Sequence, residues 1–237
     1  MLIFAYNSFM DKISIIIPVY NESVGLPALF SRIAPFAKDS EVIFADGGST
    51  DDTAKIITNN GYKCLSAPKG RANQMNHGAK AASGNVLWFL HADSIPPIDA
   101  LSQIRKVLSA GNEVGCFPIR FSSSHPLMFV NAILSNMRVR LFNIAFGDQG
   151  IFVKASLFKK IGGYAQIPLM EDLQFSKDAQ KLNHKITLTK KHIITSDRRY
   201  RTNGRLRTML QMKILQHRFR RGDSIEEIAA AYNSMKS

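Results

Sequence analysis

The chain has 237 residues, 45% of them hydrophobic, and carries a formal net charge of +13. This length and composition are enough to bury a proper core, and we expect one globular domain over residues 1–237. No apolar run reaches the length of a membrane span, and the apolar stretch at 1–10 is also shorter than a signal peptide, so we assign it no function. Cys64 and Cys116 stand far apart without a C-x-x-C spacing, which argues against a thiolate zinc cluster and fits a reducing cytoplasm.

The positive charge is concentrated near the C-terminus. Residues 181–221 contain 13 Lys or Arg and one acid, Asp197, whereas bases and acids nearly balance in the rest of the chain. A basic segment of this kind suits nucleic acid, an anionic membrane surface or polyphosphate, and a solvated tail has the same composition. Charge alone therefore leaves the partner open.

The first part of the chain alternates strands and helices. "ISIIIPV" at 13–19 predicts a strand buried on both faces, and Pro27 opens a helix behind it. "EVIFA" at 41–45 predicts a second strand, and in the helix that follows it Ser49 and Asp52 have the spacing of a capping box. The unit of strand, loop and helix thus occurs twice.

The same rhythm continues to Gly111. We expect a short strand near 62–66, a helix over 70–84, a strand over 85–90 and a helix that begins at Pro96. Strands and helices that alternate at this length predict an α/β fold, with a mostly parallel sheet covered by helices on both faces.

The pattern loosens after residue 112. We expect strands near 114–121 and 149–155, helices over 125–145 and 170–183, and two helices within 203–234, the second capped by Ser224. In the helix over 125–145, Arg138 and Arg140 face away from a single apolar stripe, which is typical of a helix packed on a core. The stripe consists of Leu127, Val130, Ile133, Met137, Leu141 and Ile144.

Acidic side chains follow several of the predicted strands. Glu22 comes shortly after the first strand, Asp46 after the second and Asp93 after "VLWFL", while Glu171 and Asp172 follow a later strand region. In open parallel sheets, ligands gather where the carboxyl ends of the strands meet. We therefore expect these carboxylates to converge on one site.

Four segments, in this order, resemble the family 2 glycosyltransferases of the GT-A fold over about residues 13–200. They are "ISIIIPVYNE", "EVIFADGGSTDDT", "NVLWFLHADS" and "LMEDLQFS". The resemblance implies a Rossmann-like nucleotide-diphospho-sugar transferase fold and an inverting, hexosyltransferase-type enzyme, which moves a sugar from a nucleotide diphosphate to an acceptor hydroxyl. The variants "DGGSTD", "GRANQMNHGA", "FGDQG" and "SDRRYRTNGRLRT" are most similar to a bacterial subgroup found beside radical-SAM and selenium-domain proteins.

The resemblance also divides the single domain. It implies a nucleotide-sugar-binding half over about 10–110, an acceptor and catalytic half over about 111–200, and a basic C-terminal helical segment over 201–237. The segment "SDRRYRTNGRLRT" stands where processive family members carry Q-x-x-R-W. We therefore expect transfer of a single sugar.

The metal motif of the family is altered here. By resemblance, Asp93 matches the last acid of the D-x-D motif, the one that meets the metal, and His91 replaces the first acid. Mg²⁺ and Mn²⁺ take oxygen ligands, often one or two carboxylates completed by phosphate oxygens and water. A neutral imidazole adds no negative charge, so we expect a divalent cation of modest affinity at Asp93, with His91 contacting the donor.

Other donor contacts follow from the resemblance. Asp46 matches the first acid of a pair that recognises the base and ribose, and Gly47 replaces the second. Cationic side chains suit the diphosphate, whose leaving charge must be stabilised. The implied donor-binding set is Pro18, Tyr20, Glu22, Asp46, Lys69, Arg71, His91, Asp93, Arg198 and Arg199.

Inversion by direct displacement needs a general base for the acceptor proton. Asp172 matches the base of the family, and beside it Glu171 orients the acceptor or pairs with a basic residue. Acids at 171 and 172 also stabilise a helix N-terminus, and both roles are compatible. "FGDQG" resembles the acceptor side, with Asp148 and Gln149 as hydroxyl contacts.

The basic segment suggests where the enzyme works. "MLQMKILQHRFRRG" interleaves apolar and basic residues, as expected of a surface that rests on anionic lipid and presents the site to a lipid-linked acceptor. We therefore expect a cytoplasmic protein with peripheral association at the inner membrane face.

Two alternatives stay open at this point. His91 and Gly47 would also suit a relative that binds nucleotide sugar without turnover. A basic module that binds nucleic acid or a membrane surface would explain the C-terminal charge, but acids at the strand ends would repel phosphate, so we expect no nucleic acid. No P-loop or H-E-x-x-H motif occurs.

Overall fold

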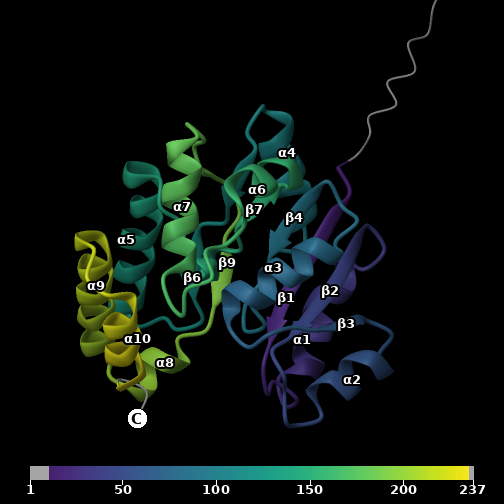
Figure 1. Cartoon of the computed structure of the whole chain (residues 1–237), viewed down its shortest axis with the longest axis horizontal. Helices are drawn as coiled ribbons and strands as arrows, with labels where there is room; N and C mark the ends of the chain where they lie inside the picture. The colour runs from purple at the N-terminus through teal and green to yellow at the C-terminus, as the bar shows by residue number, and fades with distance from the viewer. Residues whose placement is uncertain (1–10, 235–237) are drawn as a thin grey trace, which may run out of the picture.

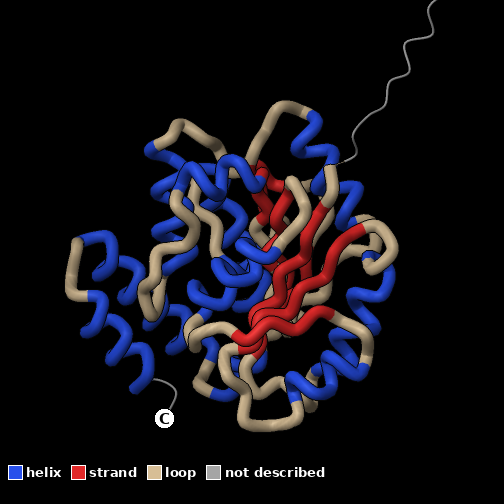
Figure 2. The backbone as a smooth tube through the Cα atoms, turned by 45° about the vertical axis from the view of Figure 1, so that its right-hand side comes forward, coloured by secondary structure: helices blue, strands red, loops and turns tan. Residues whose placement is uncertain are grey.

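A seven-stranded sheet forms the centre of the molecule, and helices surround it (Figures 1 and 2). The structure, a computed structural model, describes residues 11–234, so the apolar stretch at 1–10 lies outside the described residues. The order is β3-β2-β1-β4-β7-β5-β8, and β6 pairs with β9 beside it. The strands are β1 (Ile13–Val19), β2 (Ser40–Asp46), β3 (Lys63–Ser66), β4 (Val86–Phe89), β5 (Val114–Cys116), β6 (Ile119–Phe121), β7 (Phe152–Lys154), β8 (Thr187–Leu188) and β9 (Ile193–Thr195).

The sheet is mostly parallel, as the alternation of strands and helices predicts. β1 pairs in parallel with β2 on one side and with β4 on the other, whereas β7 is antiparallel to both β4 and β5. The chain therefore leaves β1 toward β2 and β3, and later returns on the other side of β1 as β4. Such a reversal of strand order opens a crevice at the carboxyl ends, here of β1 and β4.

Helices cover both faces of the sheet. Ile13, Ile15 and Ile17 of β1 pack on one face with the buried sides of α1 and α4, and Ile16 packs on the other with α3, α6 and α7. The helices are α1 (Leu26–Ile33), α2 (Thr53–Asn59), α3 (Arg71–Ala81), α4 (Ala100–Ser109), α5 (Pro126–Phe142), α6 (Ala155–Ile161), α7 (Glu171–Lys181), α8 (Arg198–Thr202), α9 (Arg205–Arg221) and α10 (Ile225–Ser234).

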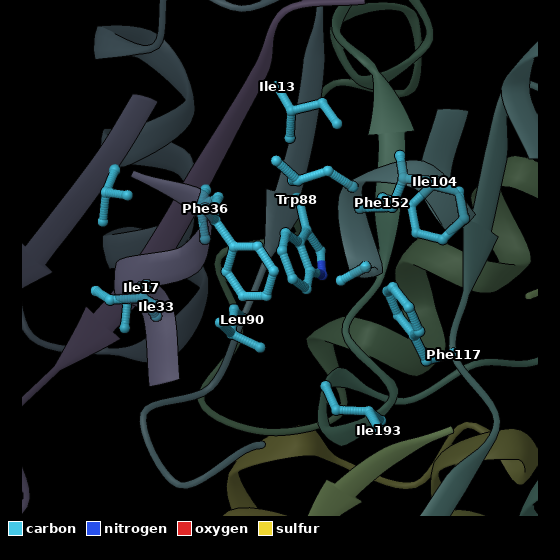
Figure 3. Close-up of a cluster of buried hydrophobic side chains, with 14 of the residues drawn as sticks. Ile13, Ile17, Ile33, Phe36, Trp88, Leu90, Ile104, Phe117, Phe152 and Ile193 are labelled. Atoms are coloured by element: carbon cyan, nitrogen blue, oxygen red, sulfur yellow. The ribbon is translucent and has the colours of Figure 1, made fainter. Parts of the chain in front are cut away.

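Trp88 lies at the centre of the hydrophobic cluster that also contains Ile13 and Ile17 of β1 (Figure 3). Its ring lies between Phe36 and Phe117, with centroids 5.7 and 5.6 Å away, and no part of Trp88 reaches solvent. Burying an aromatic side chain of this size is among the largest single apolar contributions to a core. This cluster joins β1, β4 and β7 rigidly under the crevice.

The predicted strand near 114–121 is in fact two strands in different sheets. Pro118 separates β5 from β6 and has no N–H to give to a ladder, and the Phe117 N–H is donated to the Gln149 carbonyl instead. The chain bends there, so that β6 can leave the main sheet and pair with β9.

The apolar stripe predicted on the helix over 125–145 does not pack on the core. In α5, Val130, Ile133, Met137 and Leu141 are exposed, whereas Arg138 is buried. Apolar residues occur on both sides of the helix, so the apolar spacing alone does not tell which side meets the sheet. The buried side carries Met128, Asn131, Ala132, Ser135, Arg138 and Val139.

The C-terminal segment forms two helices, as predicted. The N–H of Glu227 is donated to the Ser224 hydroxyl at 3.4 Å, at the start of α10. α9 and α10 lie beside α5 and α7, on the side of the molecule away from α1 and α2 (Figure 1). Within residues 11–234, no helix combines the length and apolar character needed to cross a membrane.

Candidate active site

Two adjoining cavities open at the carboxyl ends of β1 and β4, with volumes of about 650 and 210 Å³. The first receives most of the predicted donor-binding residues: Pro18, Tyr20, Glu22, Lys69, Arg71, His91, Asp93 and Arg198. The second receives Asp148, Asp172 and Arg199, and is covered by α9 through Met209, Met212, Lys213 and Gln216. Arg71, His91, Asp93 and Glu171 line both cavities and form their shared wall.

Asp93 is exposed at this shared wall, and the Glu22 carboxylate faces the same cavity. Burial and the nearby Asp93 charge both raise the pKa of Glu22. In residues 11–234, no three His, Cys, Asp or Glu side chains are grouped to hold a metal. A protein-bound Mg²⁺ often has only one or two carboxylate ligands and completes its shell with phosphate and water, a pattern that Asp93 with the nearby Glu22 fits.

His91 is a neutral side chain packed under a loop. Burial, assisted by the positive charge of Arg71, lowers the pKa of His91 to about 3. Its Nε2 atom is buried without a hydrogen-bond partner among the described residues, and a Cβ atom added to Gly147 would lie 2.6 Å from it. His91 thus adds no charge beside Asp93, as expected of an imidazole in place of the first acid.

Glu171 is the first residue of α7 and only 3% exposed. Its Oε1 atom lies 3.6 Å from Nη1 of Arg71, which is the first residue of α3. Burial raises the pKa of Glu171 and the negative charge of Asp172 raises it further, while Arg71 opposes both effects. Glu171 therefore pairs with a basic residue, which is one of the two roles expected for it.

Asp172 is held by backbone amides at the edge of the second cavity. Its Oδ2 atom accepts the Gly147 N–H at 2.8 Å, and its Oδ1 atom accepts the Leu173 N–H at 2.7 Å. Two such bonds fix the plane of the carboxylate and leave lone pairs on both oxygens. The loop that contains Gly147 thus determines where Asp172 points.

Asp148 and Gln149 of the same loop differ in access. Asp148 lines the second cavity, and burial raises its pKa to about 6 against the attraction of Arg138. Gln149 is fully buried, and its Oε1 atom accepts from Nη2 of Arg138 at 2.9 Å and from the Phe146 N–H at 3.1 Å. The prediction that Gln149 contacts an acceptor hydroxyl is wrong, because this side chain is used to shape the loop.

Asp46 lines neither cavity. It is buried, and its Oδ2 atom accepts the Ser49 N–H at 3.0 Å, while the Ser49 hydroxyl also bonds to this carboxylate. The predicted capping box of Ser49 and Asp52 is therefore wrong: α2 begins at Thr53, and the Asp52 side chain makes no capping bond. Asp46 orders the loop behind the first cavity and does not face into it, contrary to its expected donor contact.

Gln74 explains why position 47 holds glycine. The Gln74 side-chain amide donates to the Val19 and Ala45 carbonyls at 2.7 and 2.8 Å, which ties β1 to β2. A Cβ atom at Gly47 would lie 3.0 Å from that amide. The Gln74 amide thus occupies the space that a side chain at position 47, such as the second acid of the family's pair, would need. The sequence patterns did not single out Gln74.

The two arginines of "SDRRY" serve different cavities. Arg198 lines the first cavity, as predicted for a donor contact. Arg199 lines the second, where its guanidinium lies 4.5 Å from the Tyr232 ring centre and its Nη2 donates to the Met212 sulfur. Arg199 therefore lies in the second cavity and not in the first, where it was expected as a donor contact.

Arg138 faces away from the apolar stripe of α5, as expected, and lies beneath the second cavity. Its Nε donates to the Ile144 carbonyl at 3.1 Å, and its guanidinium covers the Phe146 ring at 3.6 Å. Asn131 and Ser135 line the cavity from the same side of α5. Polar residues at 131, 135 and 138 share one helical face by their spacing, and this signal was available in the sequence.

This order of strands, with carboxylates and cations gathered where β1 and β4 end, defines the chain as an α/β protein of the GT-A glycosyltransferase class. A family model described as Glycosyl transferase family 2 matches residues 14–160, and the chain belongs to that family.

Curated relatives agree in part of their length. An undecaprenyl-phosphate 4-deoxy-4-formamido-L-arabinose transferase of Serratia proteamaculans is 30% identical over 159 residues, which are 62% of this chain and 49% of the relative. The transferase of the same description from Shewanella sediminis is 26% identical over 163 residues, which are 63% of this chain and 49% of the relative. The chain thus spans about half the length of the curated relatives it matches.

Solved structures show the same fold at low identity. S. aureus TarS 1–349, in complex with UDP-GlcNAc, has a TM-score of 0.63 at 19% identity and covers 78% of this chain and 58% of its own. The mannosyltransferase PcManGT from Pyrobaculum calidifontis, in complex with GDP-Man and Mn²⁺, has a TM-score of 0.62 at 17% identity. The match covers 96% of this chain and 70% of PcManGT.

Proposed function

We propose that the chain is an inverting, hexosyltransferase-type glycosyltransferase, with the nucleotide diphosphate sugar in the first cavity and the acceptor in the second. The shared wall of Arg71, His91, Asp93 and Glu171 carries this proposal. A sugar carbon at that wall can be approached from the second cavity while its phosphate leaves toward the first. That arrangement suits direct displacement, which inverts the configuration at the carbon.

The donor side supplies positive charge for the leaving group. Lys69, Arg71 and Arg198 line the first cavity, and Lys69 is held over the Tyr20 ring at 4.0 Å. Cations placed where charge develops stabilise the transition state more than the ground state. A divalent Mg²⁺ or Mn²⁺, held with modest affinity at Asp93, would add Lewis acidity to the diphosphate.

The acceptor side supplies the base. Asp172 would take the proton from an acceptor hydroxyl as its oxygen attacks, and Asp148 faces the same cavity as a second polar contact. A phosphate acceptor is already anionic and needs no base, so the fixed position of Asp172 favours a hydroxyl. The curated relatives are named for undecaprenyl phosphate, and from that name we propose a lipid-linked acceptor; the hydroxyl on it is proposed from Asp172 and not from those relatives.

The setting follows from such an acceptor. A lipid-linked substrate requires the enzyme to work at a membrane, and we propose peripheral association at the cytoplasmic side. Membership of the subgroup found beside radical-SAM and selenium-domain proteins is supported by the four segment variants alone, and it names no sugar.

Thermal unfolding with nucleotide sugars tests the donor site. We expect one UDP-, GDP- or dTDP-sugar to raise the Tm, and Mn²⁺ to increase that rise, because a ligand of the native state stabilises it. Asp93→Asn should lose the increase due to Mn²⁺, whereas Asp39→Asn, an exposed aspartate outside both cavities, should keep it.

Turnover then separates an enzyme from a relative that only binds. A bound donor that is neither hydrolysed nor transferred, by the wild type and Asp172→Asn alike, would support the non-catalytic alternative. If no nucleotide sugar changes the Tm, the donor assignment itself fails.

A further inference from the structure

A third cavity, of about 730 Å³, lies outside the active site between α5 and the strand β8. Ile133, Met137 and Arg140 of α5 form one side, and Lys185, Lys190 and His192 lie on the side of β8. β8 is the last strand of the sheet. This basic groove is therefore an open feature at the sheet edge, with α5 between it and the acceptor cavity.

The basic groove gathers positive charge without acids. Arg140, Lys185, Lys190 and His192 are all exposed, and none of the described residues that line the groove is acidic. Partial burial lowers the pKa of His192, and the charges of Arg120 and Arg140 lower it further. The lowered pKa leaves the imidazole neutral near pH 7, so the positive charge of the groove comes from Arg140, Lys185 and Lys190, and an anion bound between them would relieve their repulsion.

The outer face of α5 adjoins the basic groove and is apolar. Ile133 and Met137 line the groove and are 42% and 43% exposed, and Phe129, Leu141 and Phe142 are more exposed still. Exposed apolar groups of this number mark an interaction site. Helix α9 lies beside α5 (Figure 1) and has the same character, because Leu206, Leu210 and Ile214 are exposed about one turn apart.

We propose that the basic groove and the outer face of α5 dock the protein on an anionic phospholipid surface. The phosphate headgroups would occupy the basic groove, and Ile133, Met137 and their exposed neighbours would enter the acyl boundary. Apolar side chains flanked by Lys and Arg are the pattern of interfacial helices. A second copy of the chain fits poorly, because a two-fold contact through this face would bring the same cations together.

The position of α5 links docking to the reaction. Asn131, Ser135 and Arg138 line the acceptor cavity from one side of this helix, and Ile133, Met137 and Arg140 line the basic groove from another. Docking would therefore hold the acceptor cavity one helix away from the lipid. This step rests on the proposed lipid-linked acceptor, but the docking itself does not.

Flotation of the full chain with vesicles tests the proposal. We expect binding to phosphatidylcholine vesicles that contain phosphatidylglycerol and not to phosphatidylcholine alone. Lys185→Glu with Lys190→Glu should weaken binding at least about tenfold, because each cation near an anionic surface contributes substantially. Lys38→Glu with Lys55→Glu makes the same charge change at exposed sites outside the basic groove and should bind like the wild type.

A second variant tests the apolar part. Ile133→Ser with Met137→Ser should weaken flotation without changing the charge, and its Tm should stay near that of the wild type because both side chains are exposed. Equal flotation of the wild type and the Lys185/Lys190 variant would overturn the proposal, as would a wild type that retards nucleic acid in gels and ignores vesicles. The Tm rise with nucleotide sugar, measured on the same proteins, reports the donor site separately from docking.

Discussion

Arg71 and Glu171 meet at the wall shared by the first and second cavities, with Nη1 of Arg71 3.6 Å from Oε1 of Glu171. Each is the first residue of its helix, α3 or α7, so two distant parts of the chain are joined here by one ion pair. Glu171 is buried and Arg71 is half exposed. Arg71 can therefore hold Glu171 on one side and still offer donors to a diphosphate on the other.

Removing Arg71 should weaken donor binding. We expect Arg71→Met to raise the donor Kd about 10- to 100-fold, which corresponds to the ~1.5–3 kcal/mol of a hydrogen bond to a charged group. Arg71→Lys keeps the charge and loses the planar guanidinium, so its donor Kd should lie between those of the wild type and Arg71→Met. Isothermal titration with the nucleotide sugar measures both values, and an unchanged Kd in Arg71→Met would place the diphosphate elsewhere.

Asp172→Asn should separate catalysis from binding. Loss of a general base lowers kcat about 10²- to 10⁴-fold, whereas the donor cavity, which Asp172 does not line, should bind nucleotide sugar as before. The measurement is kcat for transfer beside the donor Kd. A kcat within a few-fold of the wild type would indicate an acceptor that needs no deprotonation, such as a phosphate.

The first half of the fold could be predicted because its signals are local. The buried run at 13–19 and the strand ends marked by Glu22 and Asp93 needed only residue patterns, since parallel strands place their carboxyl ends at one edge. β7 could not be placed in this way. It enters the sheet antiparallel between β4 and β5, and a strand's pattern does not state its direction or neighbours.

The prediction of site residues succeeded for side chains that follow a strand end and line the crevice, such as Glu22 and Asp93. Asp46 and Gln149 have residue types that suit a ligand, but hydrogen bonds from Ser49 and Arg138 hold them in the protein interior. Such bonds depend on which loops meet, and no spacing in the sequence encodes that. Arg138 is the opposite case, a residue that was not proposed for the site and yet lies under the second cavity. Its position follows from which face of α5 is buried.

Gly147 should tolerate no side chain while His91 is present. A Cβ atom at position 147 would lie 2.6 Å from Nε2 of His91, so Gly147→Ala must move the loop and lengthen the bond from the Gly147 N–H to Asp172. We expect a stability loss of about 1–3 kcal/mol and a lower kcat. Chemical unfolding and transfer assays measure the two effects.

The double variant Gly147→Ala with His91→Ala provides the control. Because the smaller side chain at 91 removes the overlap, the two substitutions should be non-additive, with a coupling energy of about 0.5–3 kcal/mol. Strict additivity would show that the Gly147 loop is limited by something other than His91.

Asp148 should make the protein less stable as pH rises through its titration range. Burial raises its pKa from 3.8 to about 6, so between these values the folded state holds a proton that the unfolded state has lost, and the free energy of unfolding falls with increasing pH. Above pH 6 the buried charge exerts its full cost.

Asp148→Asn stays neutral at every pH and should remove that cost. We expect it to be more stable than the wild type at pH 7.5, by up to about 3 kcal/mol from the size of the shift, with the difference shrinking toward zero as pH approaches 4. Guanidinium unfolding across this range measures the difference, and Asp39→Asn, the same substitution at an exposed site, serves as the control. A variant less stable than the wild type by the same amount at every pH would mean that Asp148 acts through packing, and that its carboxylate is not the source of the pH dependence.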